Sequence, residues 1–145
     1  MNNAKPINIR QIDHVVIRVV DLDDMIAWYE NVLGCELERG PGDYRIAQLR
    51  AGGSLIDLVD ANGPFGKKAG APPDHSAPTV DHVCLQVSPW NTENIESQLR
   101  KHGVQFGEVG VRYGATGMGP SIYLKDPEGN TIELKGVSEV QSATG

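Results

Sequence analysis

Apolar and polar residues alternate in two short stretches of the chain, at 12–19 (IDHVVIRV) and at 80–87 (VDHVCLQV). An alternation with a period of two is typical of a half-buried β-strand. Asp, His and two valines recur at matching places in the two stretches, which indicates a duplicated unit. His14 and His82 therefore occupy equivalent positions, each on the strand face that also carries the residues two and four places further on.

A helical pattern follows each of these strands. Apolar residues at helical spacing predict helices at 23–33 and 91–102, and a glycine follows directly in both cases, at Gly34 and Gly103. Short apolar or alternating stretches then predict strands around Leu37 and at 46–49, 55–59, 104–106, 121–125 and 131–134. The predicted fold class is α+β, with the order strand, helix and three strands occurring twice.

At 145 residues the chain has the size of one domain. We expect a single domain at 10–136, made of a first module at about 10–62, a linker at 63–79 and a second module at about 80–136. The linker is rich in Gly, Pro and Ala, so neither a helix nor a sheet strand is expected in it. The remaining residues, 1–9 and 137–145, are predicted to be flexible tails.

Charge and composition exclude several classes of function. The net charge of -6, from 13 Lys and Arg against 19 Asp and Glu, is unsuited to binding a nucleic acid. No apolar stretch is long enough for a membrane span or a signal sequence, so a cytoplasmic protein without a membrane partner is expected. Cys35 and Cys84 are interpreted as reduced thiols, and Cys84 either as a pocket thiol on the face of His82 or as a small buried apolar residue.

The stretch Asp126-Pro-Glu-Gly-Asn130 is a turn signature, so the segment around it is predicted to be a hairpin with Tyr123 on its first strand and Glu133 on its second. Ile132 and Leu134 would face the helices, which leaves Glu133 on the open face of the sheet. In the first module Asp57 takes the equivalent place.

Two histidines and two carboxylates thus stand at matched positions of the repeat: His14, His82, Asp57 and Glu133. Imidazole and carboxylate together suit a borderline divalent metal ion, and a rigid sheet can hold them convergent. Taken singly, each residue is more often a satisfied or solvated side chain than a ligand. Their repetition favours a metal site.

Three motifs, IDHVVIRVVDLDDMIAWYENVLG, VDHVCLQV and YLKDPEGNTIEL, resemble the vicinal oxygen chelate superfamily, the group of glyoxalase I, bleomycin-resistance proteins and extradiol dioxygenases. The resemblance covers about residues 10–136. It implies two βαβββ modules that form a half-open, barrel-like cup around one divalent metal ion, which would be Ni, Zn, Co, Mn or Fe. It also implies a homodimer, often with a cup that combines modules from two chains.

The resemblance assigns roles to individual residues. His14, His82 and Glu133 fall on the three most common ligand positions, and Asp57 falls on the fourth, where glyoxalase I enzymes carry glutamate and methylmalonyl-CoA epimerases glutamine. Arg18 matches an arginine that contacts glutathione in bacterial glyoxalase I enzymes, although the asparagine expected near position 61 is Ala61 here.

Two further residues are candidates for substrate binding. The segment VRYGATGMGPSIYLKDPEGN is similar to a group of glyoxalase-domain-containing proteins without a characterised substrate, and its Arg112 is interpreted either as a binder of an anionic group or as an exposed arginine of a mobile loop. Tyr123 matches a tyrosine of the extradiol dioxygenases, or has a structural role.

These residues predict a metal-dependent, glyoxalase-like lyase or isomerase that acts on a small molecule held through two adjacent oxygens. Glu133 or Asp57 would remove a proton next to a carbonyl. An Fe(II) extradiol-type dioxygenase is the first alternative, but such enzymes use an additional histidine on a strand, and only His102, at a helix end, lies between His82 and Glu133. A non-enzymatic protein that binds a small molecule such as an antibiotic is the second alternative.

Overall fold

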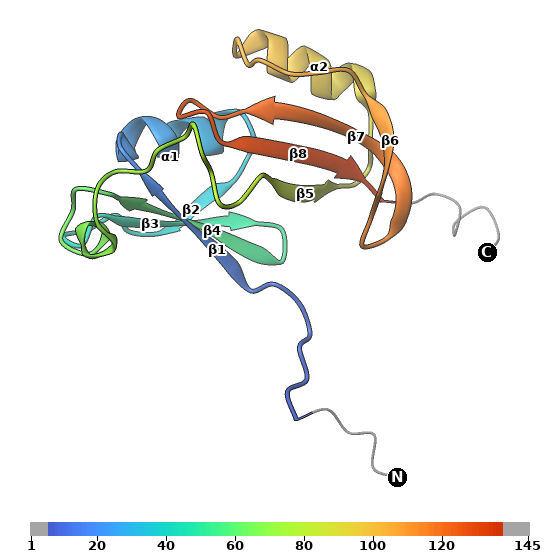
Figure 1. The fold of residues 1–145 in the computed structure, drawn as a ribbon. Helices are drawn as coiled ribbons and strands as arrows, with labels where there is room; N and C mark the ends of the chain where they lie inside the picture. The colour runs from blue at the N-terminus through green and yellow to red at the C-terminus, as the bar shows by residue number, and fades with distance from the viewer. Residues whose placement is uncertain (1–5, 138–145) are drawn as a thin grey trace.

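The structure is a computed structural model that describes residues 6–137. It contains two modules with the same order of elements (Figure 1). The first module consists of β1 (His14–Val19), α1 (Leu22–Asn31), β2 (Glu36–Arg39), β3 (Ile46–Ala51) and β4 (Ser54–Asp60). The second consists of β5 (Val83–Val87), α2 (Thr92–Lys101), β6 (Gly110–Gly114), β7 (Gly117–Lys125) and β8 (Thr131–Gly136). Most of the predicted flexible tails, at 1–9 and 137–145, lies outside the described residues.

Each module contains one mixed sheet of four strands, in the orders β1-β4-β3-β2 and β5-β8-β7-β6. β1 runs parallel to β4, and β5 runs parallel to β8, while the other neighbours are antiparallel. The register pairs Val16 with Asp57 in the first sheet and Cys84 with Glu133 in the second. The predicted equivalence of Asp57 and Glu133 is therefore confirmed, and each lies on an inner strand of its sheet.

Both helices begin at capping residues that the sequence contains. The side chain of Asp21 accepts a hydrogen bond from the backbone N–H of Asp24, and Asn91 does the same for Asn94, both at 3.0 Å. These side chains satisfy backbone donors that have no partner inside the helix. The helices predicted at 23–33 and 91–102 are confirmed, with small shifts at their ends.

Part of the strand prediction in the second module was wrong. Residues 104–106 form only an isolated bridge between Phe106 and Leu124, and the first strand after the helix is β6, at 110–114, where no strand was predicted. β7 also begins at Gly117, before the predicted start at 121. This stretch is rich in glycine and has weak strand propensity, so pairing with its neighbours decides its conformation. The linker likewise contains a short 3-10 helix, η1 (Gly66–Ala69), where no helix was expected.

One hydrophobic core spans both modules, because α1 and α2 lie on the faces of the sheets that carry the buried aliphatic residues (Figure 1). Met25 and Tyr29 of α1 and Ile122 and Ile132 of the second sheet belong to the same buried cluster, and each is at most 1% exposed. Burial of this apolar surface is the main favourable contribution to the stability of the domain.

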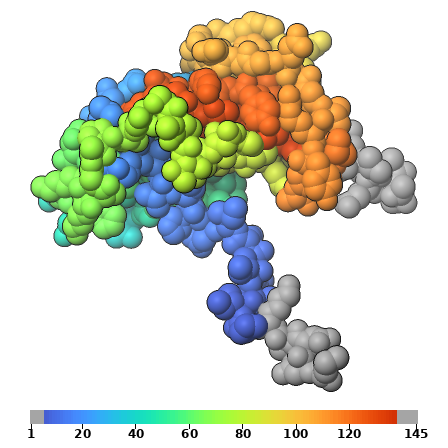
Figure 2. All heavy atoms as spheres, in the orientation of Figure 1, coloured from blue at the N-terminus to red at the C-terminus, as the bar shows by residue number. Residues whose placement is uncertain are grey.

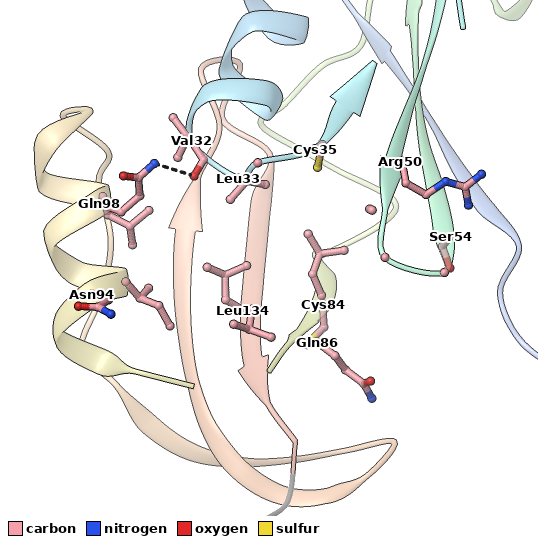
Figure 3. Close-up of a pocket in the computed structure, with 18 residues that line it drawn as sticks. Val32, Leu33, Cys35, Arg50, Ser54, Cys84, Gln86, Asn94, Gln98 and Leu134 are labelled. Carbon is pink, nitrogen blue, oxygen red and sulfur yellow. Dashed lines mark hydrogen bonds between the residues drawn. The ribbon is translucent and has the colours of Figure 1, made fainter. Parts of the chain in front are cut away.

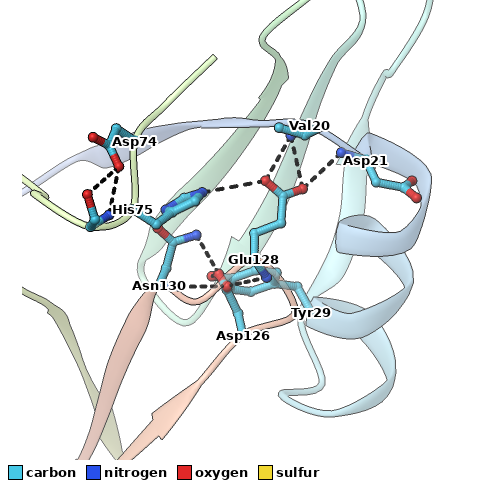
Figure 4. Close-up of polar contacts among 9 residues, drawn as sticks. Val20, Asp21, Tyr29, Asp74, His75, Asp126, Glu128 and Asn130 are labelled. Carbon is cyan, nitrogen blue, oxygen red and sulfur yellow. Dashed lines mark hydrogen bonds and ion pairs between the residues drawn. The ribbon is translucent and has the colours of Figure 1, made fainter.

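Polar contacts between the modules surround the turn from β7 to β8 (Figure 4). The hydroxyl of Tyr29 donates to Asp126 Oδ2 at 2.9 Å, and burial together with the negative charge of Asp126 raises the pKa of Tyr29 above its usual range. Glu128 accepts hydrogen bonds from the backbone N–H groups of Val20 and Asp21 at 2.8 to 2.9 Å, at the N-terminus of α1. The carboxylate is favourable there because backbone donors and the helix dipole both point toward it.

The space-filling view shows the linker lying across β1 and extending toward the second module (Figure 2). The segment before β1 extends away from the body of the molecule (Figure 2). Within residues 6–137 no helix is long and apolar enough to cross a membrane.

Candidate metal and substrate site

Both candidate histidines are oriented by the residue that precedes them. Asp13 Oδ1 lies 2.7 Å from His14 Nδ1, and Asp81 Oδ2 lies 2.7 Å from His82 Nδ1. An ionised carboxylate only accepts hydrogen bonds, so Nδ1 carries the proton in both rings and Nε2 is the nitrogen that faces other groups. A carboxylate on the distal nitrogen is the usual way in which a protein orients a metal-binding histidine.

In the first module the pair is His14 and Asp57. The hydrogen bond with Asp13 raises the pKa of His14, partial desolvation opposes this, and the negative charge of Asp57 adds to the increase. Asp57 is only 5% exposed, and its Oδ2 accepts a hydrogen bond from Gln48 Nε2 at 3.2 Å. Its Oδ1 is buried and has no hydrogen-bond partner among the described residues. Such an oxygen is costly unless a cation or a donor reaches it.

In the second module the pair is His82 and Glu133, which are in direct contact. His82 Nε2 lies 3.1 Å from Glu133 Oε1, and Glu133 is 5% exposed. Tyr123 stands opposite Glu133 on β7, as Gln48 stands opposite Asp57 on β3. The ring of Tyr123 meets that of His82 edge to face, with 5.3 Å between the ring centres. Its pKa is raised by burial, by the charge of Glu133 and by a hydrogen bond with it.

The four predicted metal ligands are thus held as two pairs. Among residues 6–137 no three His, Cys, Asp or Glu side chains gather closely enough to hold a metal ion within one chain. Each pair nevertheless fits a divalent ion by its chemistry, because it offers an imidazole nitrogen and a carboxylate oxygen on a rigid sheet. The unpartnered Oδ1 of Asp57 supports this fit, since a cation would supply the missing interaction.

Arg18, predicted to bind substrate, interacts with the linker. Its Nε donates to the Gly66 carbonyl at 3.1 Å, and its Nη2 donates to the carbonyls of Gly70 and Ala71 at 2.6 and 3.0 Å. These bonds hold the linker against β1. A contact of this kind depends on the path of the linker, which no local sequence pattern indicates, and the substrate-binding role of Arg18 stays a prediction.

Arg112 lies on β6 and not in a mobile loop, so that alternative interpretation was wrong. Its Nη1 donates to the carbonyl and to the hydroxyl of Ser121, at 2.9 and 2.6 Å. Its guanidinium carbon lies 4.6 Å from the centre of the Tyr123 ring. Arg112 therefore belongs to the same sheet face as Tyr123 and Glu133.

The interpretation of Cys84 as a small buried residue was wrong. It is exposed on β5, directly beside Glu133, whereas Cys35 is buried. Partial desolvation, followed by the charge of Glu133, raises the pKa of Cys84 to about 11. The alternation pattern correctly placed Cys84 on the face of His82, but could not show that this face is open.

Two pockets lie near these pairs. One of about 680 Å³ lies between the modules, bounded by the end of α1, the β3–β4 turn, β5 and α2, and contains none of the four candidate ligands (Figure 3). A second, of about 480 Å³, lies between β1, the linker and the β7–β8 turn, and its lining includes Arg18, His75 and His82. The chemistry of the donor atoms, and not the size of a cavity, decides metal binding. The candidate site is therefore defined by the donor atoms of the two pairs.

Comparison with known proteins agrees with the fold. A model of the Glyoxalase/Bleomycin resistance protein/Dioxygenase superfamily matches residues 11–134. The chain belongs to this superfamily. It is 35% identical over 127 residues to virulence protein STM3117 of Salmonella typhimurium strain LT2, a match that covers 87% of this chain and 83% of that protein.

The crystal structure of virulence protein STM3117 superposes with a TM-score of 0.75 at 31% identity, and the match covers 91% of this chain and 100% of that one. The chain is also 27% identical over 134 residues to the mitochondrial methylmalonyl-CoA epimerase of Homo sapiens, with 88% of this chain and 74% of that protein covered. The superfamily therefore includes enzymes, alongside proteins whose names state no reaction.

Proposed function

We propose that this protein is a metal-dependent lyase or isomerase that acts on a small substrate through two adjacent oxygen atoms. The observation that carries the proposal is the duplicated pair, His14 with Asp57 and His82 with Glu133, on matched strands. In both modules an aspartate holds Nδ1 of the histidine at 2.7 Å, so that Nε2 is available to a metal ion.

We propose further that the complete site forms between two copies of the chain. One module alone offers an imidazole and a carboxylate, and a divalent ion of this type needs about four protein ligands or three with a substrate position. A homodimer with two-fold symmetry would bring the first module of each copy to the second module of the other, and would form two equal sites. Val16, which faces the same way as His14, is 50% exposed, so apolar surface is available for such an interface.

Each residue then has a definite task. The metal ion, when bound, would polarise the substrate oxygens and stabilise negative charge on them. Glu133 is already in contact with His82 at 3.1 Å, so we assign it to metal binding. Asp57 has one oxygen without a partner, so we assign it to a weaker contact with the metal ion and to proton transfer at the carbon next to the carbonyl. Gln48 fixes the orientation of Asp57 through its other oxygen.

The similarity to a methylmalonyl-CoA epimerase supports proton transfer at carbon, because an epimerase inverts one carbon centre and removal and return of a proton achieves this. No described side chain on the face of Glu133 supplies the additional histidine that an extradiol dioxygenase would need.

The test uses the full, untagged chain and two variants, His14→Ala and His82→Ala. Each variant alone should lose metal, measured by elemental analysis after gel filtration. When the two variants are mixed and allowed to exchange subunits, half of the dimers contain both kinds of chain, and each of these has one site with both histidines intact. About a quarter of the metal content should return, because symmetry places the two substitutions in the same site of the mixed dimer.

Other outcomes separate the alternatives. Metal loss without recovery on mixing would place the site within one chain, and a stable monomer in gel filtration would contradict the shared site. Stoichiometric iron would favour the dioxygenase, and nickel, cobalt or zinc would favour the lyase or isomerase. Unchanged metal content in His82→Ala would show that the ligand assignment is wrong, and a protein that takes up no metal would favour the binding protein.

A further inference from the structure

Lys135 is a buried lysine without a carboxylate partner. It lies two residues after Glu133 on β8 and is only 3% exposed. Its Nζ donates a hydrogen bond to the carbonyl of Gly136 at 3.2 Å, and forms no ion pair with any carboxylate of residues 6–137. An ammonium group has three donors, and burying it is unfavourable unless an anion or several acceptors compensate.

Arg112 lies on the same face and is also without a carboxylate. Among residues 6–137 its hydrogen bonds engage only Nη1, which donates to the two oxygens of Ser121. Ser121 is directly opposite Lys135 in the register of β7 and β8, so both cations adjoin one residue. The edge of the guanidinium formed by Nε and Nη2 stays available, and this edge can donate two parallel hydrogen bonds to an oxyanion.

The hairpin of β6 and β7 is shaped around Lys135. A Cβ atom at Gly114 would lie 3.0 Å from the Lys135 side chain, and one at Gly119 would lie 3.2 Å from Nζ and 2.5 Å from the Gly136 carbonyl. Side chains at these two positions would push the ammonium out of its place. The glycines therefore permit the hairpin to close over the lysine while its charge is kept beside Ser121.

Several other arginines of the protein form ordinary ion pairs. Arg45, Arg50 and Arg100 each form an ion pair with an Asp or Glu side chain. The chain has a net charge of -6, so carboxylates are plentiful. Lys135 and Arg112, beside Glu133 and Tyr123, form no ion pair with a carboxylate of residues 6–137, and an anion from outside the chain would compensate them.

We infer that Lys135 and Arg112 form a subsite for an oxyanion, a carboxylate or a phosphoryl group, carried by the substrate. This inference rests on the proposed function, which places the substrate on the face of Glu133. It adds the class of substrate: a small molecule with a negatively charged group next to the oxygens that the metal holds. In the first module Val59 and Ile46 stand at the places of Lys135 and Ser121, so the subsite is formed by the second module alone.

The test measures binding of malonate, inorganic phosphate and the uncharged malonamide to the full-length, metal-free protein by calorimetry at constant ionic strength. Malonate represents a carboxylate and phosphate represents a phosphoryl group. The ligand that binds more tightly shows which of these two groups the substrate carries. Lys135→Met and Arg112→Gln should each weaken that ligand by about tenfold or more, because each removes a charge-assisted hydrogen bond. Malonamide should not bind measurably.

Lys101→Met is the matched control, since Lys101 is exposed at the end of α2 and should leave anion binding unchanged. Thermal unfolding checks that the variants are folded, and Arg112→Gln keeps the test valid if Lys135→Met does not fold. Equal binding of malonate and malonamide, or unchanged anion binding in both Lys135→Met and Arg112→Gln, would overturn the inference.

The metal test and this test fail separately. His82→Ala should lose metal and keep anion binding, whereas Lys135→Met should keep metal and lose anion binding. A protein that binds no metal, but whose anion binding depends on Lys135, would contradict the proposed function and leave the oxyanion subsite in place.

Discussion

The two modules share one scaffold but differ in the chemistry of their open faces. In the first, Asp57 keeps one buried oxygen without a partner, and Gln48 stands opposite it. In the second, Glu133 touches His82 at 3.1 Å, and Tyr123 stands opposite it. The pair of a histidine and a carboxylate is duplicated, whereas the buried Lys135 has Val59 at its place in the first module. The duplicated modules thus keep the same pair of residue types, while the neighbouring positions differ between them.

The largest effect is expected from substitution of the two carboxylates, which tests whether both bind one metal ion. Glu133→Gln and Asp57→Asn each remove a negative charge with little change of shape. Glu133→Gln should lower zinc affinity by more than about a hundredfold, and Asp57→Asn by about ten- to a hundredfold, the range typical of groups that support a metal site. Competition with a coloured chelator measures both. An affinity unchanged by Asp57→Asn would confine the metal to the second module.

The next largest effect is expected from the hydrogen bond between Tyr29 and Asp126, which joins the two modules. Tyr29→Phe removes the hydroxyl that donates to the buried Asp126 at 2.9 Å. Hydrogen bonds to charged groups contribute about 1.5–3 kcal/mol, so the free energy of unfolding should fall by that amount. Urea unfolding followed by fluorescence and by circular dichroism measures the loss. If the two probes then show separate transitions, this contact is what makes the modules unfold together.

A smaller effect is expected from the residues opposite the two carboxylates. Gln48→Leu removes the donor to Asp57, and Tyr123→Phe removes the hydroxyl beside Glu133. Each should weaken zinc binding by about tenfold, because each helps to orient a ligand. Equal losses would show that the pair in the first module and the pair in the second module contribute alike to zinc binding. A loss confined to Tyr123→Phe would show that the second module dominates, and no loss in either variant would contradict the arrangement.

The smallest effect of a substitution is the one expected for Glu133→Gln on Cys84, whose place in the first module is taken by Val16. Its pKa is raised from 9.0 to about 11, so deprotonation needs a higher pH. At pH 8 the thiolate fraction should be about a hundredfold below that of an ordinary thiol, and alkylation by iodoacetamide correspondingly slow. Glu133→Gln removes a negative charge that raises this pKa, so alkylation should become several-fold faster.

Cys84→Ser is the control, because the buried Cys35 should not react in the native protein. A reaction of Cys84 at the rate of a free thiol would mean that the charge of Glu133 does not act on it.

Much of the fold and part of the site were predictable from the sequence. The repeat placed His14 and His82 at equivalent positions, and the period of two on a strand placed Asp57 and Glu133 at equivalent positions of the two sheets, as the register confirms. The helices were predictable because each carries its own apolar spacing and capping residue. The metal-binding role of the four residues stays a prediction.

By itself, then, the sequence determined the two modules, their helices and the faces of the candidate ligands, because these depend on local periodicity and on internal repetition. Only the tertiary structure decided that Arg18 binds the linker, that the glycine-rich segment forms β6, and that Lys135 is buried without a carboxylate. It also held the four candidate ligands as two separate pairs within residues 6–137. These features depend on contacts between segments far apart in the chain, which local patterns do not encode.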